Sequence, residues 1–131
     1  MNRRLRTAQS LISLGCLVVL AGSVLHLIVA YPKVSAALAA SNLDGGLGNA
    51  LRSVFFMIGI TWIAIAVVAL IATFGKASYS KPIILFCGAM LLLLVPFWVG
   101  LMGWFVGNEM FVVAGVLIIC GGVMFQQARI E

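Results

Sequence analysis

Charged residues are scarce in this chain of 131 residues. Asp, Glu, Lys and Arg make up 8% of it, whereas about 25% is usual in soluble domains. Three acidic residues and one histidine are present, and the acids fall outside the long apolar stretches. A catalytic triad or a pair of catalytic carboxylates would therefore have no acid within those stretches. The sequence predicts that the protein is not an enzyme and has no catalytic residue.

Chelating motifs are also missing. The three cysteines, Cys16, Cys87 and Cys120, form no CxxC pair. Cysteine inside a membrane usually serves as a small apolar residue, so we expect no metal, no cofactor and no disulfide. Their similar depth along the predicted helices leaves a metal site as the alternative. The net charge is +5, but no basic stripe with interleaved aromatic residues is present, and we expect no nucleic-acid partner.

Apolar residues make up 64% of the chain and gather in four stretches, each close to the roughly 20 residues that a helix needs to cross a membrane. The stretches are residues 8–30, 51–74, 82–105 and 110–125. Backbone groups in lipid must find partners within their own segment, so these stretches should be helices. The sequence predicts one domain over residues 1–131, an all-α integral membrane bundle of four helices in up-down-up-down order.

Positive charges predict the orientation. Six of the eight Lys and Arg residues fall on one side of the spans, and Lys33 and Arg52 fall on the other. This bias places both termini in the cytoplasm, most simply in a bacterial inner membrane. The start "MNRRLR" and the "ALA" at Ala37 to Ala39 resemble a cleavable signal peptide. The apolar run is too long for such a peptide, so we expect a retained anchor.

The connection between the first two spans is the longest one. Pro32 favours the start of a short helix to about Ala40, which we expect to lie on the outer membrane surface as a short interfacial segment. The following "SNLDGGLGN" has the residues of a turn, and Asn49 is the expected N-cap of the second helix. Asn108 and Glu109 are placed to begin the fourth helix.

Residue size changes with depth in the predicted bundle. Small residues gather in the cytoplasmic half, and they let helix backbones approach closely. They include Gly15, Ala66, Ala69, Gly88 and Gly121. Bulky residues gather in the outer half, where Pro96 should also kink the third helix. They include Phe55, Trp62, Phe97, Trp98 and Phe111. We expect a tight cytoplasmic end and a recess that opens outward.

His26 is an ionisable residue inside the first span. Such residues are rare in membranes and are functional by default, but a neutral imidazole near the membrane surface can also be satisfied by neighbouring helices. Two interpretations stay open: His26 fixes helix packing, or it contacts a ligand or a proton. Ser23, one turn away on the same face, is a candidate to share a water with it.

Two weaker patterns occur near the ends of the predicted helices. "GWFVG" at Gly103 to Gly107 matches the GxxxG motif, which indicates either a dimer contact or packing within the bundle. Trp104, Tyr31 and Tyr79 suit the belt of aromatic rings at headgroup depth.

Two functions are compatible with these features. The first is a non-catalytic accessory subunit that packs against other membrane proteins or itself within the lipid bilayer. The alternative is a binding or transport module whose outer recess takes an apolar or amphipathic small molecule, a lipid or a quinone. In the alternative, the ligand-binding residues would be His26, Trp62, Trp98 and Arg52.

Overall fold

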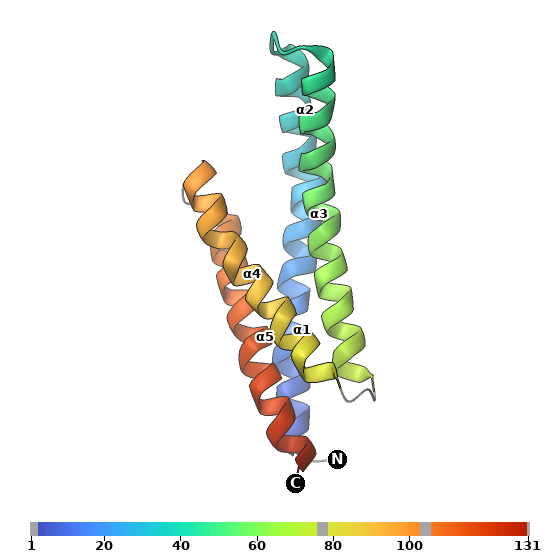
Figure 1. The fold of residues 1–131 in the computed structure, drawn as a ribbon, viewed down its shortest axis with the longest axis vertical. Helices are drawn as coiled ribbons and strands as arrows, with labels where there is room; N and C mark the ends of the chain where they lie inside the picture. Colours follow the sequence, from blue (N-terminus) through green and yellow to red (C-terminus); the bar gives the residue numbers. More distant parts are fainter. Residues whose placement is uncertain (1–2, 76–78, 103–105, 131) are drawn as a thin grey trace.

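The computed structural model describes the backbone of residues 3–75, 79–102 and 106–130, and the side chains of residues 3–75, 79–100 and 107–125. In those residues the chain is almost wholly helical. The elements are α1 (Arg3–Leu25), a π-helical segment (His26–Ala30), α2 (Tyr31–Ala40), α3 (Gly45–Phe74), α4 (Ser80–Met102) and α5 (Val106–Ile130). The prediction of an all-α four-helix bundle is confirmed (Figure 1).

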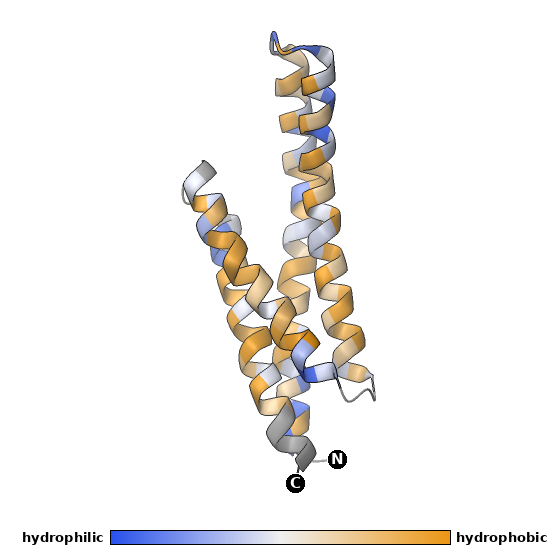
Figure 2. Cartoon of the chain, in the orientation of Figure 1, coloured by the Kyte–Doolittle hydropathy of each residue, from blue (hydrophilic) through white to orange (hydrophobic). Residues whose placement is uncertain are grey.

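Four helices are long and apolar enough to cross a membrane, as expected for a multi-pass membrane protein. They cover Arg3–Ala40, Gly45–Phe74, Ser80–Gly100 and Gly107–Phe125. Apolar residues run along most of their length, and hydrophilic residues gather near the helix ends and turns (Figure 2). The last part of the third predicted stretch, residues 103–105, lies outside the described residues, and so do Trp104 and the first three positions of the GxxxG motif.

The helices form two antiparallel pairs, α1 and α2 with α3, and α4 with α5 (Figure 1). The most extensive contact joins α1 to α5, followed by the contact of α4 with α5. The start of α1 and the end of α5 lie at the same end of the molecule, called here the termini end. The opposite end, where α2 turns into α3, is called the loop end. From the termini end to the loop end, the two pairs diverge (Figure 1).

The segment between the first two spans differs from the prediction. It was expected to lie on the membrane surface, but α2 continues the line of α1 and packs against α3 (Figure 1). Proline inside a helix lacks an N–H and its ring clashes with the carbonyl four residues earlier. Just before Pro32, the N–H of Tyr31 bonds to the carbonyl of His26, five residues back. We attribute the continuous helix to this wider π-helical turn, which makes room for Pro32.

The turn between α2 and α3 is shorter than predicted. It covers residues 41–44, and the glycines expected in the turn belong to the first turns of α3. The Gly48 N–H donates to the Asp44 carbonyl at 2.9 Å. Asp44 therefore takes the N-cap position that we had assigned to Asn49, although its side chain forms no capping hydrogen bond.

Of two predictions about α4 and α5, one stays untested and one changes. Pro96 lies inside α4, which continues past it to Met102, and the kink expected there stays a prediction. Helix α5 begins at Val106, so Asn108 lies in its first turn and is not its N-cap. The buried position of Asn108 agrees with a place inside the helix.

Glycines bring the helices together at and below the middle of the bundle. A Cβ atom added at Gly15 would lie 2.9 Å from the carbonyl oxygen of Ala114, and one added at Gly121 would lie 2.9 Å from that of Ala8. These two glycines seat α1 against α5. A Cβ atom at Gly88 would lie 3.1 Å from the carbonyl oxygen of Gly115, which joins α4 to α5 in the same way. Real Cβ atoms rarely come this close, so these positions require glycine.

The cysteines expected beside these glycines do not all face the interior. Cys16 and Cys87 are buried in the core, and Cys120 is exposed. Among the described residues, no group of three His, Cys, Asp or Glu residues is arranged to hold a metal ion. Ala66 and Ala69 on α3 are fully buried, as the prediction of small residues at this level requires.

Candidate functional site

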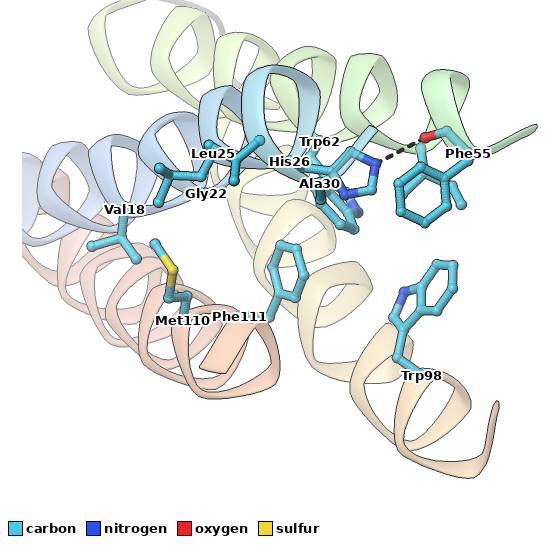
Figure 3. Close-up of a pocket in the computed structure, with 13 residues that line it drawn as sticks. Val18, Gly22, Leu25, His26, Ala30, Phe55, Trp62, Trp98, Met110 and Phe111 are labelled. Atoms are coloured by element: carbon cyan, nitrogen blue, oxygen red, sulfur yellow. Dashed lines mark hydrogen bonds between the residues drawn. The ribbon is translucent and has the colours of Figure 1, made fainter. Parts of the chain in front are cut away.

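A cavity of about 580 Å³ lies between the two diverging helix pairs. It lies within the range of about 300–1,000 Å³ that is typical of small-molecule sites. Its walls come from α1, the π-helical segment, α3, α4 and α5, and they are almost entirely apolar. Five rings, those of His26, Phe55, Trp62, Trp98 and Phe111, form much of the wall (Figure 3).

Gly22 leaves room for this cavity on the side of α1. A Cβ atom added there would lie 3.4 Å from the terminal methyl carbon of Met110, an ordinary van der Waals contact. Gly15, two turns earlier on the same helix, has no such room. The same residue type therefore allows close packing at one level and an open space at the next.

His26 is held against α3. Its Nε2 atom lies 2.8 Å from the carbonyl oxygen of Phe55, as Figure 3 shows. A carbonyl oxygen accepts but does not donate, so Nε2 carries a proton, and a neutral ring then has its free lone pair on Nδ1. The imidazole also stacks on the Phe55 ring, with centroids 4.3 Å apart and planes at 27°. The partner is thus a backbone carbonyl of a neighbouring helix.

Ser23 does not share a polar contact with His26 in the described structure. Its hydroxyl donates to the carbonyl of Val19 at 2.8 Å, within α1, and the residue is fully buried. A hydroxyl satisfied in this way by its own helix is common in membrane spans. Ser23 therefore contributes to the helix and not to the cavity wall.

Trp62 is the central ring of the wall. It is buried and meets His26 edge to face at a centroid distance of 4.8 Å, and Phe111 at 4.4 Å. Edge-to-face pairs at these distances are favourable beyond the area that they bury. Trp62 thereby connects α3 to the π-helical segment on one side and to α5 on the other.

Trp98 closes the side of α4 and carries an unusual polar atom. The residue is 9% exposed, and its indole Nε1 is buried without a hydrogen-bond partner among the described residues. In Figure 3 this nitrogen lies on the ring edge that faces Phe111 across the cavity. A buried donor without an acceptor is costly, so an acceptor brought against this nitrogen would be favourable.

A second, smaller cavity lies on the other side of the tryptophans. It measures about 350 Å³ and is bounded by α3 and α4, with Thr61 at its wall. The Thr61 hydroxyl donates to the carbonyl of Met57 at 2.9 Å, within α3. Trp62 and Trp98 line both cavities and so separate them.

The structure brings together three of the four predicted ligand-binding residues. His26, Trp62 and Trp98 line the larger cavity, and Arg52 does not. Arg52 lies one turn before Phe55 on the same face of α3, nearer the loop end. It is half-buried, and its Nε atom is buried without a hydrogen-bond partner. It therefore lies outside the cavity wall.

Gly22 and Met110 were not predicted as parts of the site, and the π-helical segment was not predicted either. A glycine in an apolar helix does not reveal whether it seats a neighbouring helix or leaves space. Pro32 was the signal that could have indicated the π-helical segment, because a proline inside a long helix requires a local change in the hydrogen bonding before it. Such segments often occur at functional sites.

The cavity is suited to binding. Among the described residues that line it, none is Asp, Glu, Lys or Arg, and the wall offers mainly ring faces and aliphatic side chains. Leu25 and Val29 at its rim are 55% and 45% exposed, so the cavity opens to the surroundings between α1 and the α4–α5 pair.

No protein-family model matches the sequence, and no curated protein or solved structure matches it either.

Proposed function

We propose that this protein binds an apolar or amphipathic small molecule in the cavity between its two helix pairs. The observation that carries this proposal is the buried, unpartnered N–H of Trp98 in a cavity whose other walls are apolar. An apolar body would fill the space against the rings, and one polar atom of the ligand would satisfy the N–H. The contact residues are His26, Trp62 and Trp98, and Arg52 lies outside the wall.

The membrane supplies such molecules directly. Lipids and quinones dissolve in the bilayer, and the half-exposed rim at Leu25 and Val29 gives them a lateral way into the cavity. The first hypothesis from the sequence, an accessory subunit that packs against other membrane proteins or itself, stays a prediction, because no feature of the described surface selects a protein partner.

The direction of the protein in the membrane is part of the proposal. The positive charges favour both termini in the cytoplasm of a bacterial cell, which places the loop end and the cavity on the outer side of the inner membrane. Reporter fusions after Lys76 and after Glu131 should then give a cytoplasmic signal, and a fusion within residues 42–44 should give the outer signal. The reverse pattern would contradict this orientation.

Co-purified molecules test the proposed function. Gly22→Leu should fill the cavity from α1, displacing the flexible end of Met110. Gly100→Leu is the matched control, because a Cβ atom at Gly100 meets no atom of the described residues within 4 Å. We expect wild type and Gly100→Leu to retain a specific small molecule in mass spectrometry of the detergent-purified protein, and Gly22→Leu to lose it. Equal retention by all three proteins would contradict a ligand in this cavity.

A further inference from the structure

The chemistry of the cavity wall narrows the class of ligand, on the premise that the proposed function is correct. We infer that the ligand is an uncharged lipophilic ring compound with a carbonyl oxygen, of the quinone class, and that this oxygen accepts the hydrogen bond of the Trp98 indole.

The first argument is the direction of the missing hydrogen bond. An indole N–H donates and does not accept, so the ligand must present an acceptor. Trp98 is buried, and its Nε1 has no protein partner within the described residues. A carbonyl oxygen meets this requirement without bringing a donor of its own into the apolar space. A plain hydrocarbon chain would leave the N–H unsatisfied.

The second argument is charge. The described wall residues include no cationic side chain, and Arg52 lies outside the wall, nearer the loop end. A phosphate or carboxylate moved into such a space would lose its hydration without gaining a counter-charge. The cavity therefore selects against the headgroup of a phospholipid or a fatty acid, although their chains are apolar enough to enter it.

The third argument is shape. The wall presents ring edges and faces. The ring centroid of Trp62 lies 4.4 Å from that of Phe111 and 4.8 Å from that of His26. Flat conjugated rings gain from offset or edge-to-face contact with such side chains, beyond the area that they bury. The open rim at Leu25 and Val29 lets an attached tail continue into the bilayer. A planar head with an apolar tail uses both features.

His26 adds a polar position on the opposite helix pair. Its Nε2 is engaged with Phe55, and within the described structure Nδ1 forms no hydrogen bond. Trp98 and His26 thus border the cavity from α4 and from the π-helical segment. The assignment to Trp98 does not depend on His26, and it can be tested separately.

The test compares two probes on three proteins in detergent by isothermal titration calorimetry. The probes are a ubiquinone with a ten-carbon tail and an alkylbenzene with the same tail, and the proteins are wild type, Trp98→Phe and Phe86→Leu. Trp98→Phe keeps an aromatic ring and removes the N–H. Phe86 is an exposed residue on the same helix, so Phe86→Leu is the control.

We expect Trp98→Phe to bind the quinone about threefold to tenfold more weakly than wild type, the effect of losing one hydrogen bond. The alkylbenzene should bind wild type and Trp98→Phe equally, and Phe86→Leu should behave as wild type with both probes. Equal quinone affinity of wild type and Trp98→Phe, or no quinone binding to wild type, would overturn the inference.

A second measurement keeps the test decisive if Trp98→Phe folds poorly. In wild type labelled with ¹⁵N-tryptophan, the quinone should move one indole N–H proton resonance downfield, and the alkylbenzene should not. An indole spectrum unchanged by saturating quinone would count against the inference. The proposed function would survive either failure if Gly22→Leu still loses a co-purified molecule, and it would fall if Gly22→Leu retains that molecule.

Discussion

The termini end and the loop end of this bundle are packed by opposite means. At the termini end, glycines let backbones touch: a Cβ atom at Gly121 would lie 2.9 Å from a carbonyl oxygen of α1. Nearer the middle of the molecule, where the two pairs diverge toward the loop end, aromatic rings face one another across a cavity of about 580 Å³. Van der Waals packing between small residues is a main source of helix association in lipid. The glycine contacts can therefore hold the pairs together where they meet and leave the other end free to open.

The comparison also explains why the cavity can exist. An open space costs stability because the atoms around it lose contacts. Here the Trp62 ring contacts the rings of Phe111 and His26, at centroid distances of 4.4 and 4.8 Å. These contacts support the wall without atoms inside the cavity. The glycine contacts thus stabilise the bundle, and the open region is the one that the proposed function assigns to binding.

The largest effect is expected from crowding the termini end. Gly121→Leu places a branched side chain against Ile12 and the backbone of Ala8, and we expect it to lower the free energy of unfolding by about 3 kcal/mol, the upper part of the range for overpacking. Gly88→Leu should behave similarly. Thermal unfolding in detergent, with Gly100→Leu as the control, measures the difference. A Gly121→Leu protein as stable as the control would show that this end is not tightly packed.

A matched pair on α1 sharpens the comparison. Gly15→Ala puts a Cβ atom 2.9 Å from the Ala114 carbonyl oxygen and should cost about 1–2 kcal/mol, because backbone atoms must shift. Gly22→Ala has room, and it should gain up to about 1 kcal/mol, since alanine favours helix over glycine. Chemical unfolding of both variants gives the sign. Equal changes at the two positions would remove the distinction between the ends.

A smaller effect is expected at His26. His26→Leu removes the bond to the Phe55 carbonyl and should cost about 0.5–1.5 kcal/mol, whereas His26→Gln keeps a donor and should be nearly silent. Phe55 lies inside α3, where its carbonyl also serves the helix, so the loss stays modest. Unfolding measured between about pH 5 and 8 separates packing from proton sensing. A pH dependence present in wild type and lost in both variants would favour proton sensing.

The sequence was sufficient for much of this picture. Long apolar stretches predicted four membrane-length helices, because lipid leaves the backbone no other way to satisfy its polar groups. The position of Gly88 and Gly121 predicted close helix contacts, and the structure confirms them. Aromatic residues gather in the other half of the predicted bundle, which predicted a recess there, and a cavity lies at that level.

Other features could not be predicted, for physical reasons. The extension of the first helix through Pro32 depends on a hydrogen bond between residues five apart, which local propensity does not encode. The partner of His26 is a backbone carbonyl, and every residue type supplies one. Arg52 was predicted as a ligand contact, but it does not line the cavity, and the spacing of residues alone does not show where a cavity wall ends.

Quenching of tryptophan fluorescence by brominated phospholipids tests most directly whether the cavity between the helix pairs is open. In a Trp104→Phe protein, the remaining tryptophans are Trp62 and Trp98, and both are at least nine-tenths buried yet line the cavity. In vesicles with bromine on the upper part of the acyl chains, we expect their fluorescence to fall and Gly22→Leu to restore much of it. Fluorescence that brominated lipid leaves unchanged would contradict an open cavity between the helix pairs.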